Sequence, residues 1–299
     1  MKLVVAGSAA LDTIRTPREV HEDTLGGSSV YASLSASFFS RVALISVVGE
    51  DFPRKYLKVL RKRNIDISGL NMLPGRTFRW EAAYDGNLEH ARTIRTEINV
   101  FDGFTPSIPY TVGGNSNLLL ANIDPGLQNY ILKKIKPSGL VACDTMNLWI
   151  ERDLKGLLKL LKKIDIFLIN DAEARQLSGE KNLMDAARYI SSKGAGMTVI
   201  KKGEHGVLFF NKGLCFTSPA YLVGKVKDPT GAGDTFAGGM MGYITGKKKI
   251  DTGVLRRALV HGSIMASFAV ERFSADSLAR IGPEDIRGRY KEFRELTRF

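Results

Sequence analysis

A glycine-rich turn in the segment KVKDPTGAGDTFAGG lies between two aspartates, Asp228 and Asp234. Small and apolar residues recur at helical spacing after Asp234, so we expect a helix to begin at the turn. Backbone N–H groups at a helix start lack partners within the helix and can bind a phosphate or a developing anion. A carboxylate beside them adds a proton acceptor, so the segment predicts phosphoryl transfer. The turn consists of Gly231, Ala232 and Gly233.

The same turn has a simpler interpretation. Asp234 can be only a first-turn carboxylate that stabilises the helix N-terminus, and the glycines can serve only to turn the chain. The Walker A pattern GxxxxGK[ST] is absent from the turn. If the turn binds phosphate, it therefore belongs to another phosphotransferase design.

The elements that must position this turn are visible as an alternation of strands and helices. Short apolar runs, typical of buried strands, are separated by amphipathic helical segments. This alternation requires crossover connections, so we expect an α/β fold with a mainly parallel, doubly wound sheet flanked by helices, whose ligands gather at the carboxyl ends of the strands. The runs cover residues 3–7, 42–49, 117–123, 140–144, 164–170, 197–203 and 206–210, and the helical segments include 53–64, 127–135, 151–163, 172–179 and 183–194.

Two segments interrupt the alternation, residues 13–25 and residues 76–98. Both alternate polar and apolar side chains, as exposed antiparallel ribbons do, and the YDGN sequence that begins at Tyr84 is typical of a hairpin turn. We expect these segments to form a small β-rich lid on a single domain that spans residues 1–299. Exposed strand edges can pair with a second copy, so a monomer and a homodimer through the lid both stay open.

Composition excludes several classes of protein. The 299 residues carry a net charge of +12, but the basic residues are scattered and show no nucleic-acid-binding signature. No apolar run approaches the roughly 18 residues that a membrane span needs, and the N-terminus does not resemble a signal peptide. The cysteines, Cys143 and Cys215, have neither disulfide nor zinc spacing. We expect a cytoplasmic protein with no nucleic-acid or membrane partner.

The segment DPTGAGDTFAGG closely resembles the C-terminal signature of the PfkB, or ribokinase-like, carbohydrate kinases. Further pieces follow the order of that family, so the resemblance covers nearly the whole chain. They are GSAALD, which ends at Asp12; GGSSVYAS, from Gly26; CDTMNLW, from Cys143; NDAEA, from Asn170; and KKGEHG, from Lys201.

The resemblance implies ATP-dependent phosphorylation of a sugar-like alcohol, assisted by Mg²⁺. It gives Asp234 the role of base toward the acceptor hydroxyl and makes the turn before it an anion hole. Whether a monovalent cation binds near Asp228 and Thr230, as in some relatives, stays open. The acceptor-binding residues that it implies are Asp12, Gly26, Gly27, Tyr31, Asp144 and Asn147. The residues that it implies for ATP are Asn170, Glu173, Lys201, Gly203, Gly206 and Thr230, with Glu173 also holding Mg²⁺ through water.

Each piece also has a local explanation. Asn170 and Glu173 have the spacing of a helix capping box. KKGEHG can be a hairpin turn with glycines at positive φ. Asp12 can cap the exit from the first strand, and turn chemistry alone favours Asp144 and Asn147 at a strand end. None of these explanations predicts that all the pieces occur in one order along one chain.

The acceptor is less well defined, because the chain departs from the common family pattern. Tyr31 stands where an asparagine that helps to hold the sugar is usual, and Thr145 and Met146 replace parts of an Asp-Pro-Asn-x-Arg form. These variants look more like the branch that includes myo-inositol kinases, so a cyclitol is the leading acceptor, with a ribokinase or fructokinase type as an alternative.

Two further alternatives follow from charge and from binding. A sugar phosphate is an alternative acceptor, because lid arginines can clamp a phosphate. A nucleotide or polyol sensor without turnover is the non-enzymatic alternative. The arginines of the lid are Arg76, Arg79, Arg92 and Arg95.

Overall fold

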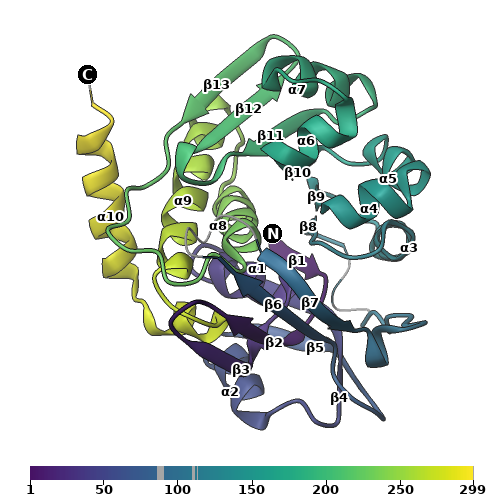
Figure 1. The fold of residues 1–299 in the computed structure, drawn as a ribbon. Helices are drawn as coiled ribbons and strands as arrows, with labels where there is room; N and C mark the ends of the chain where they lie inside the picture. Colours follow the sequence, from purple (N-terminus) through teal and green to yellow (C-terminus); the bar gives the residue numbers. More distant parts are fainter. Residues whose placement is uncertain (86–90, 110–111, 113, 299) are drawn as a thin grey trace.

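A nine-stranded sheet forms the centre of the computed structural model, which describes residues 1–85, 91–109, 112 and 114–298 (Figure 1). Its order is β13-β12-β11-β10-β9-β8-β1-β4-β5, and all neighbours from β11 to β5 are parallel. β12 and β13 extend one edge as antiparallel strands. The strands are β1 (Lys2–Ala6), β4 (Val42–Gly49), β5 (Ile65–Leu73), β8 (Ser116–Leu120), β9 (Val141–Asp144), β10 (Ile166–Asn170), β11 (Met197–Lys201), β12 (Val207–Asn211) and β13 (Leu214–Ser218).

Helices cover both faces of this sheet, so the predicted doubly wound α/β fold is confirmed. Neighbouring residues of one strand, such as Val4 and Val5, belong to different hydrophobic clusters because strand side chains alternate between faces. One cluster lies under α1 (Ser28–Ala36), α2 (Arg54–Lys62), α8 (Ala232–Thr245) and α9 (Thr252–Val270), with α10 (Pro283–Leu296) packed on α9. The other lies under α3 (Pro125–Ile135), α4 (Asn147–Arg152), α5 (Leu154–Leu161), α6 (Asp171–Ser178) and α7 (Leu183–Ser192).

The predicted lid is a separate four-stranded sheet with the order β3-β2-β6-β7 (Figure 1). Its hairpins β2–β3 and β6–β7 are antiparallel, as predicted, but β2 and β6 pair in parallel. They do so because β2 and β6 follow β1 and β5, which run in the same direction through the large sheet. The YDGN turn falls on Gly86 and Asn87, outside the described residues. The lid strands are β2 (Ala10–Arg15), β3 (Val20–Gly26), β6 (Arg79–Tyr84) and β7 (Ala91–Glu97).

None of the described helices is both long enough and apolar enough to span a membrane.

A buried histidine couples the packing of α8, α9 and α10 to pH. His261 stacks between Tyr243 and Tyr290, with ring centroids 4.3 and 4.9 Å away. Burial, together with the charges of Lys247 and Arg257, lowers the pKa of His261 to about 4. The folded protein therefore binds this proton less readily than the unfolded chain does.

We expect the free energy of unfolding to fall by roughly 2 kcal/mol between pH 7 and pH 5 through His261 alone. The sign follows from the lowered pKa, because the unfolded state gains the proton first as the pH falls. His261→Phe should remove this part of the loss in urea unfolding at the two pH values. His205→Gln is the matched control, because the His205 side chain is 79% exposed. An equal loss in His261→Phe and wild type would contradict the assignment.

Candidate active site

The turn before α8 is built around a left-handed glycine. Gly231 has φ +72 and precedes the first helical residue, Ala232. The N–H of Ala232 already donates to the carbonyl oxygen of Pro229 at 3.1 Å. Within the described part of the chain, the N–H groups of Gly231, Gly233 and Asp234 have no protein acceptor. The predicted anion cradle therefore needs a correction: Ala232 does not offer a free N–H group, and Asp234 does.

Tyr31 explains why only glycine fits at the start of this turn. A Cβ on Gly231 would lie 2.5 Å from the Tyr31 ring, and a side chain there would also be strained by the positive φ. Tyr31 is buried in α1, and burial with the charges of Asp228 and Asp12 raises its pKa well above the usual value. Its ring therefore stays uncharged and forms an aromatic wall beside the turn.

The environment of Asp234 raises the pKa of its carboxyl group. Burial and the negative charge of Asp144 raise the pKa of Asp234 to about 7, although Lys201 opposes the shift. A carboxyl with a pKa near neutrality combines a substantial ionised fraction with appreciable basicity, as a general base requires. The simpler role of a first-turn carboxylate accounts for the position of Asp234 but not for this environment.

A lysine links the turn to the carboxyl edge of the sheet. Lys201, at the end of β11, donates to both carboxylate oxygens of Asp144, at the end of β9, at 2.6 and 2.9 Å. Its Nζ lies 3.1 Å from where a Cβ on Gly233 would be. Burial alone would lower the pKa of Lys201, but Asp144, Glu173 and Asp234 raise it above its usual value. Lys201 therefore stays charged beside the anion cradle.

Asn170 and Glu173 form the capping box that local sequence patterns predict. The N–H of Asn170 donates to Glu173 Oε2 at 2.9 Å, and the N–H of Glu173 donates to Asn170 Oδ1 at 2.8 Å. Burial raises the pKa of Glu173 to about 7, and the positive charge of Lys201 opposes that rise. The capping box thus also holds a carboxyl group toward Lys201.

The lid supplies a carboxyl group to the other side of the turn. Asp12 lies inside β2 and is buried, so it does not cap the first strand. Burial and the charge of Asp228 raise the pKa of Asp12 to about 8, against the effect of the Gly27 N–H. A Cβ on Gly26 would overlap the Asp12 carboxyl group, and Gly27 has φ +96. The Gly-Gly pair therefore lets the chain pass closely around a protonated Asp12.

Asp228 and Thr230 connect the turn to the lid. Asp228 Oδ1 accepts the N–H of Thr230 at 2.9 Å, while its buried Oδ2 has no partner within the described residues. The Thr230 hydroxyl lies 2.9 Å from the hydroxyl of Tyr84, in lid strand β6. Thr230, which the resemblance assigns to ATP, therefore makes its side-chain contact with the lid.

Three of the predicted residues bring no side chain into this cluster. The side chain of Asn147 is exposed, and only its backbone N–H interacts with Glu173. Gly203 and Gly206 border η3 (Gly203–His205) in the β11–β12 hairpin, with φ +55 and +83. The hairpin explanation of KKGEHG is therefore confirmed for the backbone.

The lid arginines are largely occupied by acidic partners. Arg79 pairs with Asp23 and Asp51, and Arg76 and Arg95 both pair with Glu97. Arg92 is exposed on β7. These contacts weaken the alternative of a phosphate clamp in the lid.

Sequence reasoning missed Tyr84 and Asn122. Asn122 lies just after β8; its Oδ1 accepts the indole N–H of Trp149 at 2.8 Å, and its Nδ2 donates to Met146 Sδ at 3.1 Å. Trp149 and Met146 thus fix a polar side chain at the carboxyl edge. Asn122 falls inside the predicted 117–123 strand, whereas β8 ends at Leu120.

The site fits a polyanionic ligand better than a protein-bound metal. Free N–H groups and a charged Lys201 suit the phosphates of ATP. Among the residues described, no group of three or more His, Cys, Asp or Glu side chains is placed to hold a metal ion. Mg²⁺ would therefore be bound mainly by phosphate oxygens and water. Glu173 is the protein carboxylate that would hold it through a water molecule.

We expect Asp12→Ala to raise the KM for the acceptor roughly tenfold or more, because a buried hydrogen-bonding group is lost. Asp12→Asn should retain more affinity at pH 7, because Asp12 with a pKa of about 8 is mostly protonated there. The KM for ATP should stay unchanged in both variants. Steady-state kinetics with each substrate varied in turn would test this; a changed ATP KM with an unchanged acceptor KM would contradict it.

Residues 2–280 match the family model described as pfkB family carbohydrate kinase. The chain is 30% identical over 256 residues to the cytidine kinase of Thermococcus kodakarensis, covering 83% of this chain and 90% of that protein. It is 24% identical over 291 residues to the inositol 3-kinase of Arabidopsis thaliana, covering 90% of this chain and 74% of that one.

A solved structure has the same fold. The aminoimidazole riboside kinase from Salmonella enterica, in complex with aminoimidazole riboside and an ATP analogue, gives a TM-score of 0.77 at 17% identity. The match covers 97% of this chain and 99% of that chain.

Proposed function

The chain belongs to the pfkB family of carbohydrate kinases, which transfer a phosphoryl group to a hydroxyl of a sugar or nucleoside, and from this premise we propose its acceptor and mechanism. The proposed donor is ATP with Mg²⁺. The proposed acceptor is a neutral polyol, with a nucleoside such as cytidine as the leading candidate and myo-inositol as the second.

The main support for this proposal is the group of carboxyl side chains on the side of the turn where the acceptor would bind. Asp12, Asp228 and Asp234 interact electrostatically around Tyr31. Lys201, whose charge acts on Asp234, is held by Asp144 on the donor side. A phosphorylated acceptor would meet carboxyl groups without a cation to pair with, which costs binding energy. A neutral polyol can instead exchange hydrogen bonds with these carboxyl groups.

Different observations favour the two candidates. The cytidine kinase is similar over most of both chains, and the riboside kinase shares the fold. For myo-inositol, the support is the inositol 3-kinase relative and the variant Asp-Thr-Met-Asn sequence from Asp144.

In the proposed mechanism, Asp234 accepts the proton of the attacking hydroxyl. The free N–H groups of Gly231 and Gly233, with Lys201, stabilise the negative charge on the transferred phosphoryl group. Bound Mg²⁺ would neutralise charge on the phosphates. The lid, joined to the turn through Tyr84, covers the acceptor and excludes water, which limits ATP hydrolysis.

A coupled assay of ADP release with an acceptor panel tests the proposal. The panel contains cytidine, uridine, adenosine, myo-inositol, ribose, fructose and fructose 6-phosphate. We expect the highest kcat/KM with cytidine, measurable turnover with other neutral polyols, and little with fructose 6-phosphate. Preference for the sugar phosphate would refute the neutral-acceptor proposal, and preference for myo-inositol would reverse the order of the two candidates.

A further inference from the structure

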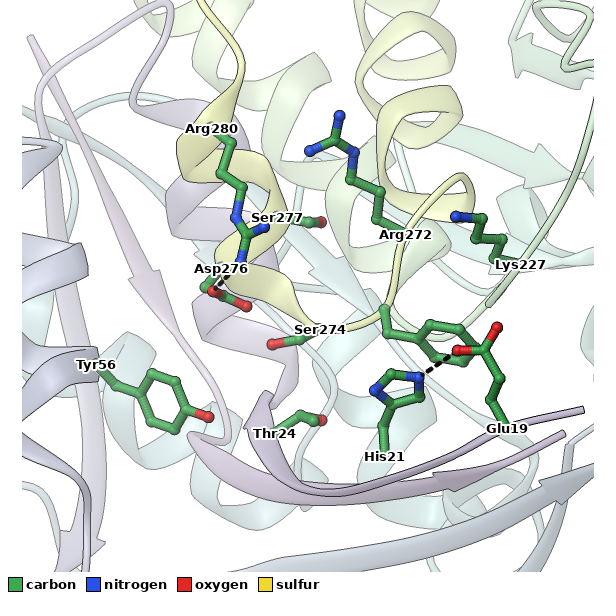
Figure 2. Close-up of a pocket in the computed structure, with 11 residues that line it drawn as sticks. Glu19, His21, Thr24, Tyr56, Lys227, Arg272, Ser274, Asp276, Ser277 and Arg280 are labelled. Atoms are coloured by element: carbon green, nitrogen blue, oxygen red, sulfur yellow. Dashed lines mark hydrogen bonds and ion pairs between the residues drawn. The ribbon is translucent and has the colours of Figure 1, made fainter.

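A cavity with a volume of about 540 Å³ lies between lid strand β3 and η4 (Ala275–Arg280), and none of the residues of the candidate active site lines it (Figure 2). The lid contributes His21 and Thr24, and the main domain contributes Lys227 and residues from Arg272 onward. Its walls therefore come from both parts of the protein.

Positive charge predominates in this cavity. Lys227, Arg272 and Arg280 line it. Arg280 pairs with Asp276 at 3.3 Å, whereas Lys227 and Arg272 form no ion pair with any described residue. Figure 2 shows the three basic side chains on the main-domain side of the cavity, opposite the lid residues. Glu19 is held by His21 at 2.9 Å.

A buried hydroxyl adds an unused donor. Ser277 lines the cavity, is 4% exposed, and its Oγ has no hydrogen-bond partner within the described chain. The hydrogen-bonding capacity of this hydroxyl is therefore free for a bound ligand. Together with Lys227 and Arg272, it suits the oxygens of a phosphate group.

The cavity is also larger than a phosphate ion needs and has a planar wall. His21 stacks on Phe273, with ring centroids 3.9 Å apart and an interplanar angle of 20°. A neighbouring hollow shares Lys227 and Phe273 and adds the basic residue Lys225. These features suit a small organic molecule that carries the phosphate.

We propose that this cavity binds a phosphate monoester of a small polyol at a site distinct from the active site, and that this binding raises the affinity of the active site for the acceptor. Two contacts connect the cavity to the acceptor side. The hydroxyl of Thr24 donates to the carbonyl oxygen of Asp12 at 3.0 Å. Lys227 immediately precedes Asp228, and both donate their N–H groups to the Val270 carbonyl oxygen, at 2.8 and 3.2 Å.

An effect on acceptor affinity is expected because the cavity is lined by both the lid and the main domain. A ligand that contacts β3 and the main domain together stabilises the arrangement in which the lid rests on the main domain. Such a ligand shifts the population toward that arrangement by its differential affinity. It should therefore lower the acceptor KM without entering the active site.

Calorimetric titration of the full chain tests the binding. Ribose 5-phosphate and inorganic phosphate serve as probes, with the donor site saturated by a non-hydrolysable ATP analogue and Mg²⁺. We expect one ribose 5-phosphate to bind, more tightly than inorganic phosphate. Lys227→Ala with Arg272→Ala should weaken this binding roughly tenfold or more, because charge-assisted hydrogen bonds are lost. Lys212→Ala is the matched control, because Lys212 is an exposed lysine in the β12–β13 turn.

Several outcomes would overturn the proposal. Unchanged binding in the double variant would place the ligand elsewhere, and equal affinity for both probes would exclude a monoester site. Ribose 5-phosphate should also lower the acceptor KM of the wild type but not of the double variant. An unchanged acceptor KM in the wild type would refute the coupling. The calorimetric result does not depend on which acceptor is phosphorylated, so it stands apart from the proposed function.

Discussion

Asp234→Asn is expected to fold and to bind ATP like the wild type while its kcat falls about 10²- to 10⁴-fold, the usual contribution of a general base. The amide keeps the shape of the carboxyl group but cannot accept the proton of the attacking hydroxyl. The coupled assay gives kcat, and calorimetry with the ATP analogue gives donor affinity. Near wild-type turnover would remove Asp234 from the reaction.

A matched control separates catalysis from helix stabilisation. Asp285 is the third residue of α10, as Asp234 is of α8, and its carboxylate accepts the N–H of Gly282 at 2.7 Å. Asp285→Asn should cost a fraction of 1 kcal/mol to about 1 kcal/mol in stability, as first-turn charges do, and leave kcat unchanged. If Asp234→Asn behaved in the same way, the simpler first-turn role would be correct.

Lys201→Met is expected to lower the free energy of unfolding by roughly 3–5 kcal/mol and to abolish most turnover. The substitution leaves Asp144, Glu173 and Asp234 close together in a buried site without their counter-charge, and isolated buried charges are costly. It also removes the ammonium group beside the anion cradle. Urea unfolding measures the first effect, and the coupled assay measures the second.

A double variant distinguishes the two roles of Lys201. Lys201→Met with Asp144→Asn removes both charges of the pair, and replacing a buried pair in this way is often close to neutral for stability. We expect much of the stability to return while kcat stays low, because the phosphate still lacks its cation. Recovery of turnover together with stability would mean that Lys201 acts only as a structural partner of Asp144.

The large sheet could be predicted because its strands are buried on both faces and therefore read as apolar runs. The predicted 42–49 run is β4 residue for residue, and the other runs differ by a few residues at their ends. Helix α1 was not predicted, because all nine of its residues are buried and leave no amphipathic pattern. β5 was also missed, because its buried and exposed residues neither form a run nor alternate regularly.

The site was predictable where one short segment contains both the residue and the reason for it. Asp234 and its glycine turn belong to this class. The partners of these residues were not predictable, because they come from distant segments: Asp144 binds a lysine 57 residues away, and Thr230 contacts Tyr84 across 146 residues. Asn147, whose role is implied by resemblance alone, has an exposed side chain, and its role in acceptor binding stays a prediction.

The central claim is that Asp234 accepts the proton of the attacking hydroxyl. Its most direct test is the pH dependence of kcat at saturating ATP and acceptor. Protonation of Asp234 blocks catalysis, so kcat of the wild type should fall as the pH drops through about 7. Glu173, whose charge raises the pKa of Asp234, provides a further check: Glu173→Gln should move this fall to lower pH. A wild-type kcat that stays level from pH 8 to well below 7, or a fall that persists unchanged in the residual activity of Asp234→Asn, would contradict the account.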